Sequence, residues 1–324
     1  MLRKLLAVGC VVMATAATPA RAADDINFGI IATEASANLK KIWEPFLADM
    51  SKKIGMKVTG FYASDYAGVI EAMRFNKVQI AWHGNKSAME AVDRANGEIF
   101  VQSVDKDGNP GYWSHIIVHK DSPFQKLEDV LKCDKNLDYG TGDPNSTSGF
   151  LVPTTFVFSA RNIDPKTCFK TVRAANHEAN ALAVANKLVH AAANNNENLI
   201  RLKKTAPEKA EQIRVIWTSP LIPSDPIVWH KDLPTDTKKK LEEFFLTYGT
   251  QDEAEKKVLA ELGWAPFKKS DNNQLLPIRQ MEINRSILKI KSDDKIAEAD
   301  KAAQLAALQK RFDDIGTQLA ALKK

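Results

Sequence analysis

The sequence predicts an α/β protein built as two lobes, and three observations support this prediction. Short apolar segments of strand character alternate with amphipathic segments of helical character, which is the rhythm of βαβ units. The chain has 324 residues, enough for two domains of ordinary size. Two segments containing proline interrupt the alternation, which indicates that the chain leaves one lobe and later returns to it.

The apolar segments define the expected elements in chain order. The first set runs as strand, helix, strand, helix and three further strands, at residues 26–31, 39–54, 57–62, 67–76, 78–82, 99–104 and 115–119. After residue 121 the same rhythm resumes, with segments at 137–140, 150–160, 171–174, 179–187, 188–192 and 213–218. This alternation is typical of a mostly parallel sheet with helices on both faces.

The crossings between the lobes are expected at residues 120–123 and 219–226, the second of which contains three prolines. Residues 23–120 and 226–292 are therefore assigned to the first lobe, and residues 121–225 to the second. Ligands of α/β sheets bind beyond the carboxyl ends of the strands, so the cleft between the lobes is the expected binding site.

Residues 1–22 have the pattern of a cleavable signal peptide for export. Arg3 and Lys4 precede an apolar run at 5–17, and the small residues around Arg21 suit a cleavage site. The run is too short to span a bilayer. An alternative is lipidation at Cys10, although Ala7 fits the start of a lipidation motif poorly.

The charge balance gives no reason to expect nucleic acid or acidic membranes as partners. Three of the 45 Lys and Arg residues lie within residues 1–22, which leaves 42 against 40 Asp and Glu.

Two cysteines follow the signal segment, Cys133 and Cys168. An even number in an oxidising compartment favours one disulfide, and the alternative is a pair of buried thiols.

Residues 293–324 predict an amphipathic helix with a stripe of large apolar side chains. The stripe comprises Leu305, Leu308, Phe312, Ile315, Leu319 and Leu322, at spacings of three and four residues. A stripe of this length packs either on its own domain or on a second subunit, as in a homodimer.

Residues 142–149, Gly-Asp-Pro-Asn-Ser-Thr-Ser-Gly, place Ser146, Thr147 and Ser148 where a helix should begin. A helix start carries unpaired N–H groups and a partial positive charge, so it attracts an oxyanion. The three hydroxyls would add donors at the same point. The alternative is an ordinary turn with an N-cap, for which these residue types are also preferred.

Five further polar residues lie at strand ends or in loops, where they can converge on a cleft: Tyr66, Tyr112, His177, Glu197 and Asp225. Each has a plain structural explanation, such as a packed ring, a helix start or a turn. Taken together, two carboxylates and two aromatic rings opposite an anion site favour an ammonium group. The expected ligand is a small zwitterion with a phosphonate-like head and an amine tail.

Several segments of the chain resemble the periplasmic binding proteins of bacterial phosphonate ABC transporters. They are residues 27–31, 65–68, 73–77, 87–97, 110–113, 142–153, 180–187, 217–229 and 262–267. The resemblance covers nearly all of the chain beyond residue 22 and weakens in the terminal helix. It implies a two-lobed type II solute-binding fold in the periplasm and delivery of ligand to a membrane permease. It implies no enzyme activity, cofactor or metal.

The resemblance also implies 2-aminoethylphosphonate as the preferred ligand. Ser146, Thr147, Ser148 and His177 match the positions that bind the phosphonate, and Tyr66, Tyr112, Glu197 and Asp225 match those at the amine end. Two departures are His83, where a tyrosine is expected, and His190, where an acidic residue is usual.

Two other functions compete with phosphonate binding. A receptor for inorganic phosphate or phosphite would gain nothing from two carboxylates at its site. A secreted phosphoester or phosphonate hydrolase with Ser146 or Thr147 as nucleophile would need an oriented base or a metal cluster. The pair His177–Glu178 is the one suggestion of such a base, and no Gly-x-Ser-x-Gly motif surrounds Ser146.

Overall fold

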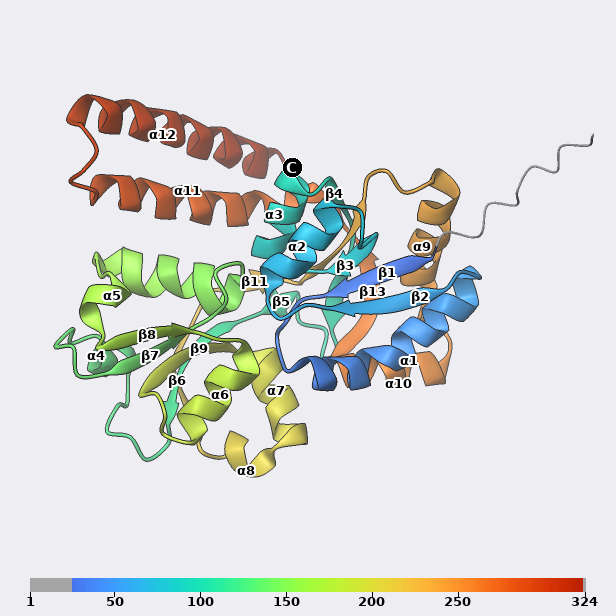
Figure 1. Ribbon diagram of the computed structural model, residues 1–324, viewed down its shortest axis with the longest axis horizontal. Helices are drawn as coiled ribbons and strands as arrows, with labels where there is room; N and C mark the ends of the chain where they lie inside the picture. Colours follow the sequence, from blue (N-terminus) through green and yellow to red (C-terminus); the bar gives the residue numbers. More distant parts are fainter. Residues whose placement is uncertain (1–24, 323–324) are drawn as a thin grey trace, which may run out of the picture.

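The computed structural model describes residues 25–322 and shows two α/β lobes side by side (Figure 1). The expected signal segment and Cys10 lie outside the described residues. Among the helices within residues 25–322, none combines the length and the apolar composition that crossing a bilayer requires.

The first lobe is organised around a six-stranded sheet with the order β13-β4-β12-β3-β1-β2. Its strands are β1 (Ile26–Ile30), β2 (Val58–Tyr62), β3 (Ile80–Trp82), β4 (Gly97–Asp105), β12 (Pro226–His230) and β13 (Trp264–Lys269). Its helices are α1 (Ser36–Ile54), α2 (Tyr66–Arg74), α3 (Asn85–Arg94), α9 (Thr235–Thr247) and α10 (Glu253–Leu262).

The second lobe is organised around a five-stranded sheet with the order β10-β6-β9-β7-β8. Its strands are β6 (Ser114–His119), β7 (Asp138–Thr141), β8 (Thr171–Ala174), β9 (Ala191–Asn195) and β10 (Ile213–Thr218). Its helices are α4 (Leu127–Val130), α5 (Pro165–Cys168), α6 (His177–Ala185), α7 (Asn196–Thr205) and α8 (Pro207–Ala210). Helical turns at Thr147–Leu151, Thr154–Phe158 and Ser159–Arg161 follow one another after β7.

The two segments that cross between the lobes pair with each other. The short strand β5 (Gly111–Tyr112) lies on the outward crossing and pairs antiparallel with β11 (Ile222–Pro223) on the return. Gly111 is required at this point, because a Cβ there would lie 1.9 Å from the carbonyl oxygen of Ile222. The crossings therefore form one two-stranded hinge rather than two separate linkers.

The structure corrects two expectations about the sheets. β6 pairs with β9 and β10, so the outward crossing precedes Ser114 and does not lie at residues 120–123. Both sheets are also mixed rather than mostly parallel: the first has two parallel and three antiparallel pairings. In the first sheet, β12 returns from the other lobe and runs antiparallel to β3 and β4, and β13 runs antiparallel to β4. In the second sheet, β6 runs antiparallel to both β9 and β10.

Each lobe has its own apolar core, in which aromatic rings are prominent. In the first lobe, Trp43 and Phe46 of α1 pack around Phe28 of β1, with ring centroids 5.3 and 6.5 Å away. In the second lobe, Tyr139 stacks on Phe169 at 4.8 Å. A disulfide joins Cys133 to Cys168 beside this second core, so the two cysteines are not a pair of buried thiols.

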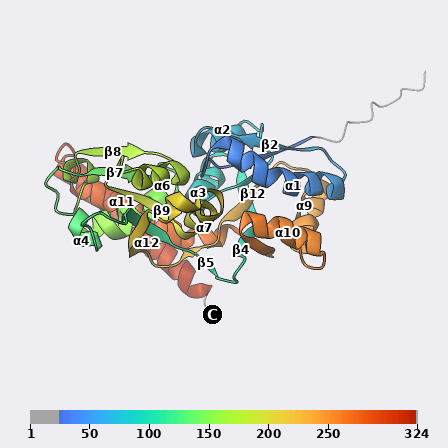
Figure 2. The same cartoon turned by 90° about the horizontal axis from the view of Figure 1, so that it is seen from below.

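The chain ends in a helical hairpin formed by α11 (Leu276–Lys291) and α12 (Glu298–Ala321), preceded by a turn at Asn272–Leu275. The apolar stripe of α12 faces α11: Ile315 is buried with Leu276 and Ile283, and Leu308, Phe312 and Leu319 pack against them. Of the two alternatives for this stripe, packing within the chain is the one observed. The hairpin extends over the second lobe, where it overlaps that lobe in the view from below (Figure 2).

Candidate functional site

A pocket of about 270 Å³ lies between the lobes, next to the hinge strand β5. All eight residues expected at a binding site line it, and six others complete the wall. The fourteen lining residues are Ile31, Thr33, Tyr66, Trp82, Gly84, Tyr112, Ser146, Thr147, Ser148, His177, Asn195, Glu197, Arg201 and Asp225.

The hydroxyls at one end of the pocket are positioned by the turn that follows β7. Ser146 caps the helical turn Thr147–Leu151, and its Oγ accepts a hydrogen bond from the N–H of Gly149 at 3.0 Å. This turn is wound wider than an α-helix, because the N–H of Leu151 bonds back to the carbonyl of Ser146. Gly149 packs closely against Gly142, and a Cβ on Gly142 would lie 2.5 Å from Cα of Gly149.

Each of the other two hydroxyls is held by a different part of the fold. The Oγ1 of Thr147 accepts from the N–H of Lys86, at the start of α3 in the first lobe, at 2.9 Å. The Oγ of Ser148 accepts from the Nδ2 of Asn195, at the end of β9, at 3.0 Å. Each hydroxyl accepts one hydrogen bond from the protein and keeps its own proton, which it can donate to an anion in the pocket.

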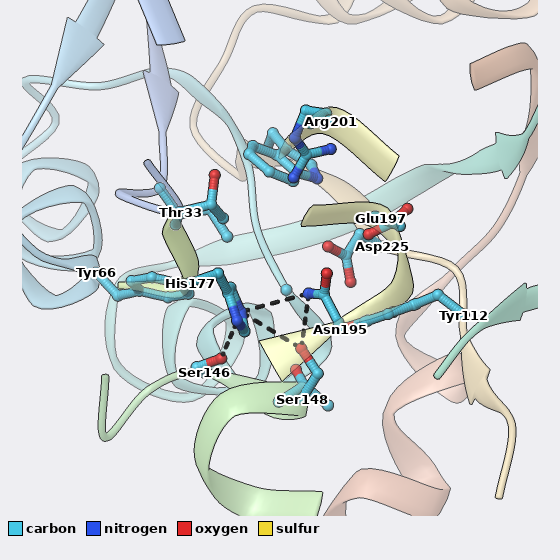
Figure 3. Close-up of a pocket in the computed structure, with 14 residues that line it drawn as sticks. Thr33, Tyr66, Tyr112, Ser146, Ser148, His177, Asn195, Glu197, Arg201 and Asp225 are labelled. Atoms are coloured by element: carbon cyan, nitrogen blue, oxygen red, sulfur yellow. Dashed lines mark hydrogen bonds between the residues drawn. The ribbon is translucent and has the colours of Figure 1, made fainter. Parts of the chain in front are cut away.

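His177 begins α6 and lies beside the serines (Figure 3). Its Nε2 is 3.4 Å from the Oγ atoms of both Ser146 and Ser148. Burial, helped by the positive charge of Arg201, lowers the pKa of His177 to about 3. The imidazole is therefore neutral near pH 7, and it acts at this site as a hydrogen-bonding group rather than as a cation.

Several helices start at the pocket. Tyr66 is the first residue of α2, His177 of α6, and Thr147 of the helical turn after β7, while Gly84 and Asn195 are the N-cap residues of α3 and α7. Each start presents backbone N–H groups and the positive end of a helix dipole. The combination favours an anion at the end of the pocket that carries the hydroxyls.

Two carboxylates lie near each other in another part of the pocket wall. Glu197 comes from the first turn of α7, and Asp225 directly precedes β12, where its carbonyl accepts hydrogen bonds from Ser103. Burial raises the pKa of Glu197, and burial together with the charge of Glu197 raises the pKa of Asp225 well above its usual value. Two acidic groups that disfavour each other's charge make a site that a cation would stabilise.

The two tyrosines lie between the two ends of the pocket. Burial and then the charges of Asp225 and Glu197 raise the pKa of Tyr112 well above its usual value. Burial also raises the pKa of Tyr66, which adjoins both Ser146 and the charge of Asp225. Tyr66 therefore lies near the hydroxyl end of the pocket as well as near the acidic end. The family resemblance implied a role at the amine end alone.

Four polar atoms of the pocket are buried without a hydrogen-bond partner in the described part of the chain. They are Oγ1 of Thr33, Nε1 of Trp82, Nδ1 of His177 and Oδ1 of Asp225. Buried polar atoms in native proteins are nearly always paired, so these four atoms are available for polar contacts with a ligand, with Trp82 and Asp225 also close enough to interact with each other.

Sequence reasoning missed Arg201, together with Thr33, Trp82 and Asn195. Arg201 lies one helical turn after Glu197 on α7 and pairs with Glu34, which follows β1 in the first lobe. Burial disfavours its charge, but Glu34 and Glu197 outweigh burial and raise the pKa of Arg201. The spacing of four residues from Glu197 was the available signal, since it places both side chains on one face of a helix.

The two histidines that depart from the family pattern do not line the pocket. His83 is fully buried and its Nδ1 lies 3.2 Å from the Oγ of Ser87. His190 accepts a hydrogen bond from the N–H of Asp138 at 2.9 Å.

The geometry gives little support to nucleophilic catalysis. The distances of 3.4 Å between His177 and the serine hydroxyls are long for a hydrogen bond that activates a nucleophile. The opposite ring nitrogen, Nδ1, lacks an orienting partner among residues 25–322. The arrangement is suited to holding a small molecule with a negative and a positive end.

Comparisons with known proteins identify relatives that bind phosphonates. A family model described as the periplasmic substrate-binding protein of phosphonate ABC transporters matches residues 28–275. The phosphonates-binding periplasmic protein of Escherichia coli K12 is 55% identical over 306 residues, which are 94% of this chain and 90% of that protein.

Two solved structures are similar to this chain. A binding protein component of an ABC phosphonate transporter from Pseudomonas aeruginosa superposes with a TM-score of 0.90 at 52% identity, covering 92% of this chain and 99% of the other. PhnD1 of Prochlorococcus marinus, solved in complex with methylphosphonate, has a TM-score of 0.72 at 22% identity, covers 80% and 98% of the two chains, and supports the fold alone.

Proposed function

This chain belongs to the family of periplasmic substrate-binding proteins of phosphonate ABC transporters, and on that premise we propose that it captures 2-aminoethylphosphonate in preference to other phosphonates. The family has the two-lobed architecture of periplasmic binding proteins and serves transport rather than catalysis, so the protein is not an enzyme. Phosphonates lacking the amine are the secondary ligands of this proposal.

One observation supports this specificity most directly: hydroxyls and helix starts occupy one end of the pocket, and two mutually destabilised carboxylates occupy another. In the proposed complex, Ser146, Thr147, Ser148 and His177 contact the phosphonate. Glu197 and Asp225 receive the ammonium group between the rings of Tyr66 and Tyr112.

The energetics of binding require the lobes to close on the ligand. Micromolar affinity corresponds to about −8 kcal/mol, whereas association costs roughly 4–15 kcal/mol. Hydrogen bonds to charged groups contribute about 1.5–3 kcal/mol each. The eight proposed contact residues suggest about six to eight such bonds. These bonds are strong enough for sub-micromolar affinity only where water is excluded from the pocket, as it is when the lobes close. A ligand that contacts both lobes shifts the open–closed equilibrium towards the closed form. We propose that the membrane permease recognises this closed form.

We further propose that residues 1–22 act as the signal peptide that directs the chain to the periplasm. Cleavage would leave Cys133 and Cys168 in an oxidising compartment, which suits the disulfide between them.

The proposed function places one ligand site in each chain and does not depend on a second subunit. The apolar stripe of α12 packs against α11 of the same chain. A homodimer through α12, the other expectation for this helix, would have to use the outer face of the hairpin.

Isothermal titration with 2-aminoethylphosphonate, methylphosphonate and inorganic phosphate tests the proposal. We expect the aminophosphonate to bind most tightly, methylphosphonate more weakly and phosphate weakest. Tighter binding of phosphate would identify an importer of inorganic phosphate or phosphite instead, because the acidic end would then be unused. Release of phosphate from 2-aminoethylphosphonate by the pure protein would point to the hydrolase.

A further inference from the structure

Three helices of the first lobe begin at the interface between the lobes, and each gives a backbone N–H to a side-chain oxygen of the second lobe. For α1, the N–H of Ala35 donates to Oε2 of Glu178 at 2.8 Å. For α2, the N–H of Tyr66 donates to Oδ2 of Asp143 at 3.2 Å. For α3, the N–H of Lys86 donates to Oγ1 of Thr147.

Two of these helices lack a capping side chain of their own. The N-cap residues of α1 and α3 are Ala35 and Gly84, and neither supplies a side-chain hydrogen bond to its helix. By contrast, the helices of the second lobe that line the pocket cap themselves, α6 through Asn176 and α7 through Asn195. α2 has its own cap, because Oδ1 of Asp65 accepts from the N–H of Gly68 at 2.8 Å. The starts of α1 and α3 therefore depend on oxygen acceptors from the opposite lobe.

Glu178 makes the most extensive of these contacts. Besides the bond to Ala35, its Oε1 accepts from Nδ2 of Asn38 at 2.7 Å, and its own N–H donates to the carbonyl of Thr33 at 3.3 Å. Asp143 is held in place within its own lobe, because its Oδ1 accepts from the N–H of Asn145 at 2.7 Å. Neither carboxylate lines the ligand pocket.

We infer that Glu178 and Asp143 are positioning residues that set the affinity for every ligand by binding the starts of α1 and α2 across the closed cleft, Glu178 as the missing cap of α1 and Asp143 as a second acceptor beside Asp65. These bonds join different lobes, so they form when the lobes meet and are lost when the lobes separate. A carboxylate at a helix start also interacts favourably with the helix dipole. The hydrogen bonds of Glu178 and Asp143 stabilise only the closed state, whichever ligand is bound. The inference rests on the proposed capture of phosphonates by lobe closure.

The test measures the affinities of Glu178→Ala and Asp143→Ala for 2-aminoethylphosphonate and for methylphosphonate. Loss of an N-cap costs roughly 2- to 30-fold in an equilibrium constant, and we expect each variant to weaken both ligands by the same factor in this range. Glu178→Gln keeps the acceptor oxygen and should recover part of the loss. Glu208→Ala removes an exposed glutamate from the first turn of α8 in the same lobe and serves as the control.

Hydrogen exchange of the peptide containing Ala35 and Asn38 supplies a readout that a general loss of stability would not reproduce. In the ligand complex, this peptide should lose protection in Glu178→Ala and keep it in Glu208→Ala. Unchanged affinities, or a loss confined to one ligand, would overturn the inference. If the wild-type protein bound neither phosphonate, the proposed function would fail. Titration with inorganic phosphate would then decide: a loss of affinity in Glu178→Ala but not in Glu208→Ala supports the contact across the cleft, and equal affinities refute it.

Discussion

Arg201 of the second lobe and Glu34 of the first form a buried ion pair at the edge of the ligand pocket. The exposed fractions of their side chains are 16% and 6%, and the guanidinium Nε donates to the carboxylate. Because the partners belong to different lobes, the pair is complete when the cleft is closed. Arg201 also lies near Glu197, so the pair links closure of the cleft to the charge at the acidic end.

We expect Glu34→Gln to weaken the binding of 2-aminoethylphosphonate by less than the about 3–5 kcal/mol of a fully broken buried pair, since Arg201 keeps Glu197 nearby in the closed form. A double-mutant cycle with Arg201→Gln isolates the pairwise interaction. The double variant should lose less affinity than the sum of the two single losses. Additive losses in calorimetry would show that the two side chains act independently.

Sequence reasoning found the residues whose type and local position carry information. Ser146 and Glu197 sit at helix starts, which the Asp, Asn and Ser residues around them mark clearly. Arg201 was missed because an arginine followed by Lys203 and Lys204 is typical of an exposed helix face. It becomes buried only when the other lobe covers it. Likewise, β6 has the same composition as the strands of the first lobe, and only its pairing with β9 places it in the second.

Glu197→Ala should distinguish the two ends of the ligand. The variant leaves a bound ammonium without one of its carboxylate partners, which costs about 3–5 kcal/mol for a buried pair. Because Glu197 remains partly exposed, the lower part of this range is expected. Methylphosphonate has no amine and should lose much less. If calorimetry showed equal losses of affinity for both ligands, Glu197 would not contact the amine.

Replacing Ser146 and Thr147 together by alanine should weaken 2-aminoethylphosphonate and methylphosphonate alike. Two hydroxyls that donate to an anion contribute about 3–6 kcal/mol together, from about 1.5–3 kcal/mol for each bond to a charged group. Ser146 also caps the turn that contains Gly149, so the melting temperature of each single variant must be measured as a control. Unchanged affinities in a folded double variant would show that Ser146 and Thr147 do not bind the phosphonate.

Proton exchange on binding should differ between the two phosphonates. In the closed pocket, burial raises the pKa of both Glu197 and Asp225, and the charge of Glu197 raises that of Asp225 further. A bound ammonium stabilises both anions and reverses these shifts. Closure on methylphosphonate should therefore take up more protons than closure on 2-aminoethylphosphonate. As a consequence, the preference for the aminophosphonate should grow as the pH rises above the ordinary carboxyl range.

Calorimetry in buffers with different ionisation enthalpies measures this proton exchange directly. The variant carrying both Glu197→Gln and Asp225→Asn provides the control, because it lacks the titrating groups and should show no such difference beyond that of the ligands themselves. The same difference in proton uptake in this variant and in the wild-type protein would contradict the assignment.

His83 should make the stability of the ligand-free protein depend on pH. Burial lowers its pKa from 6.5 to about 3, and the Nε2 atom has no hydrogen-bond partner within residues 25–322. The unfolded chain therefore binds a proton at a higher pH than the folded chain does. The stabilisation is complete above pH 6.5 and is lost as the pH falls towards 3. One such group contributes a slope of about 1.4 kcal/mol per pH unit in this interval.

Chemical unfolding of the wild-type protein and of His83→Asn at several pH values between these limits tests the prediction. The substitution keeps a polar group near the Oγ of Ser87 but removes the titration. The free energy of unfolding of the variant should therefore fall less steeply with decreasing pH, whatever its absolute stability. Equal slopes in His83→Asn and the wild-type protein would mean that His83 is protonated in the folded state as readily as in the unfolded chain.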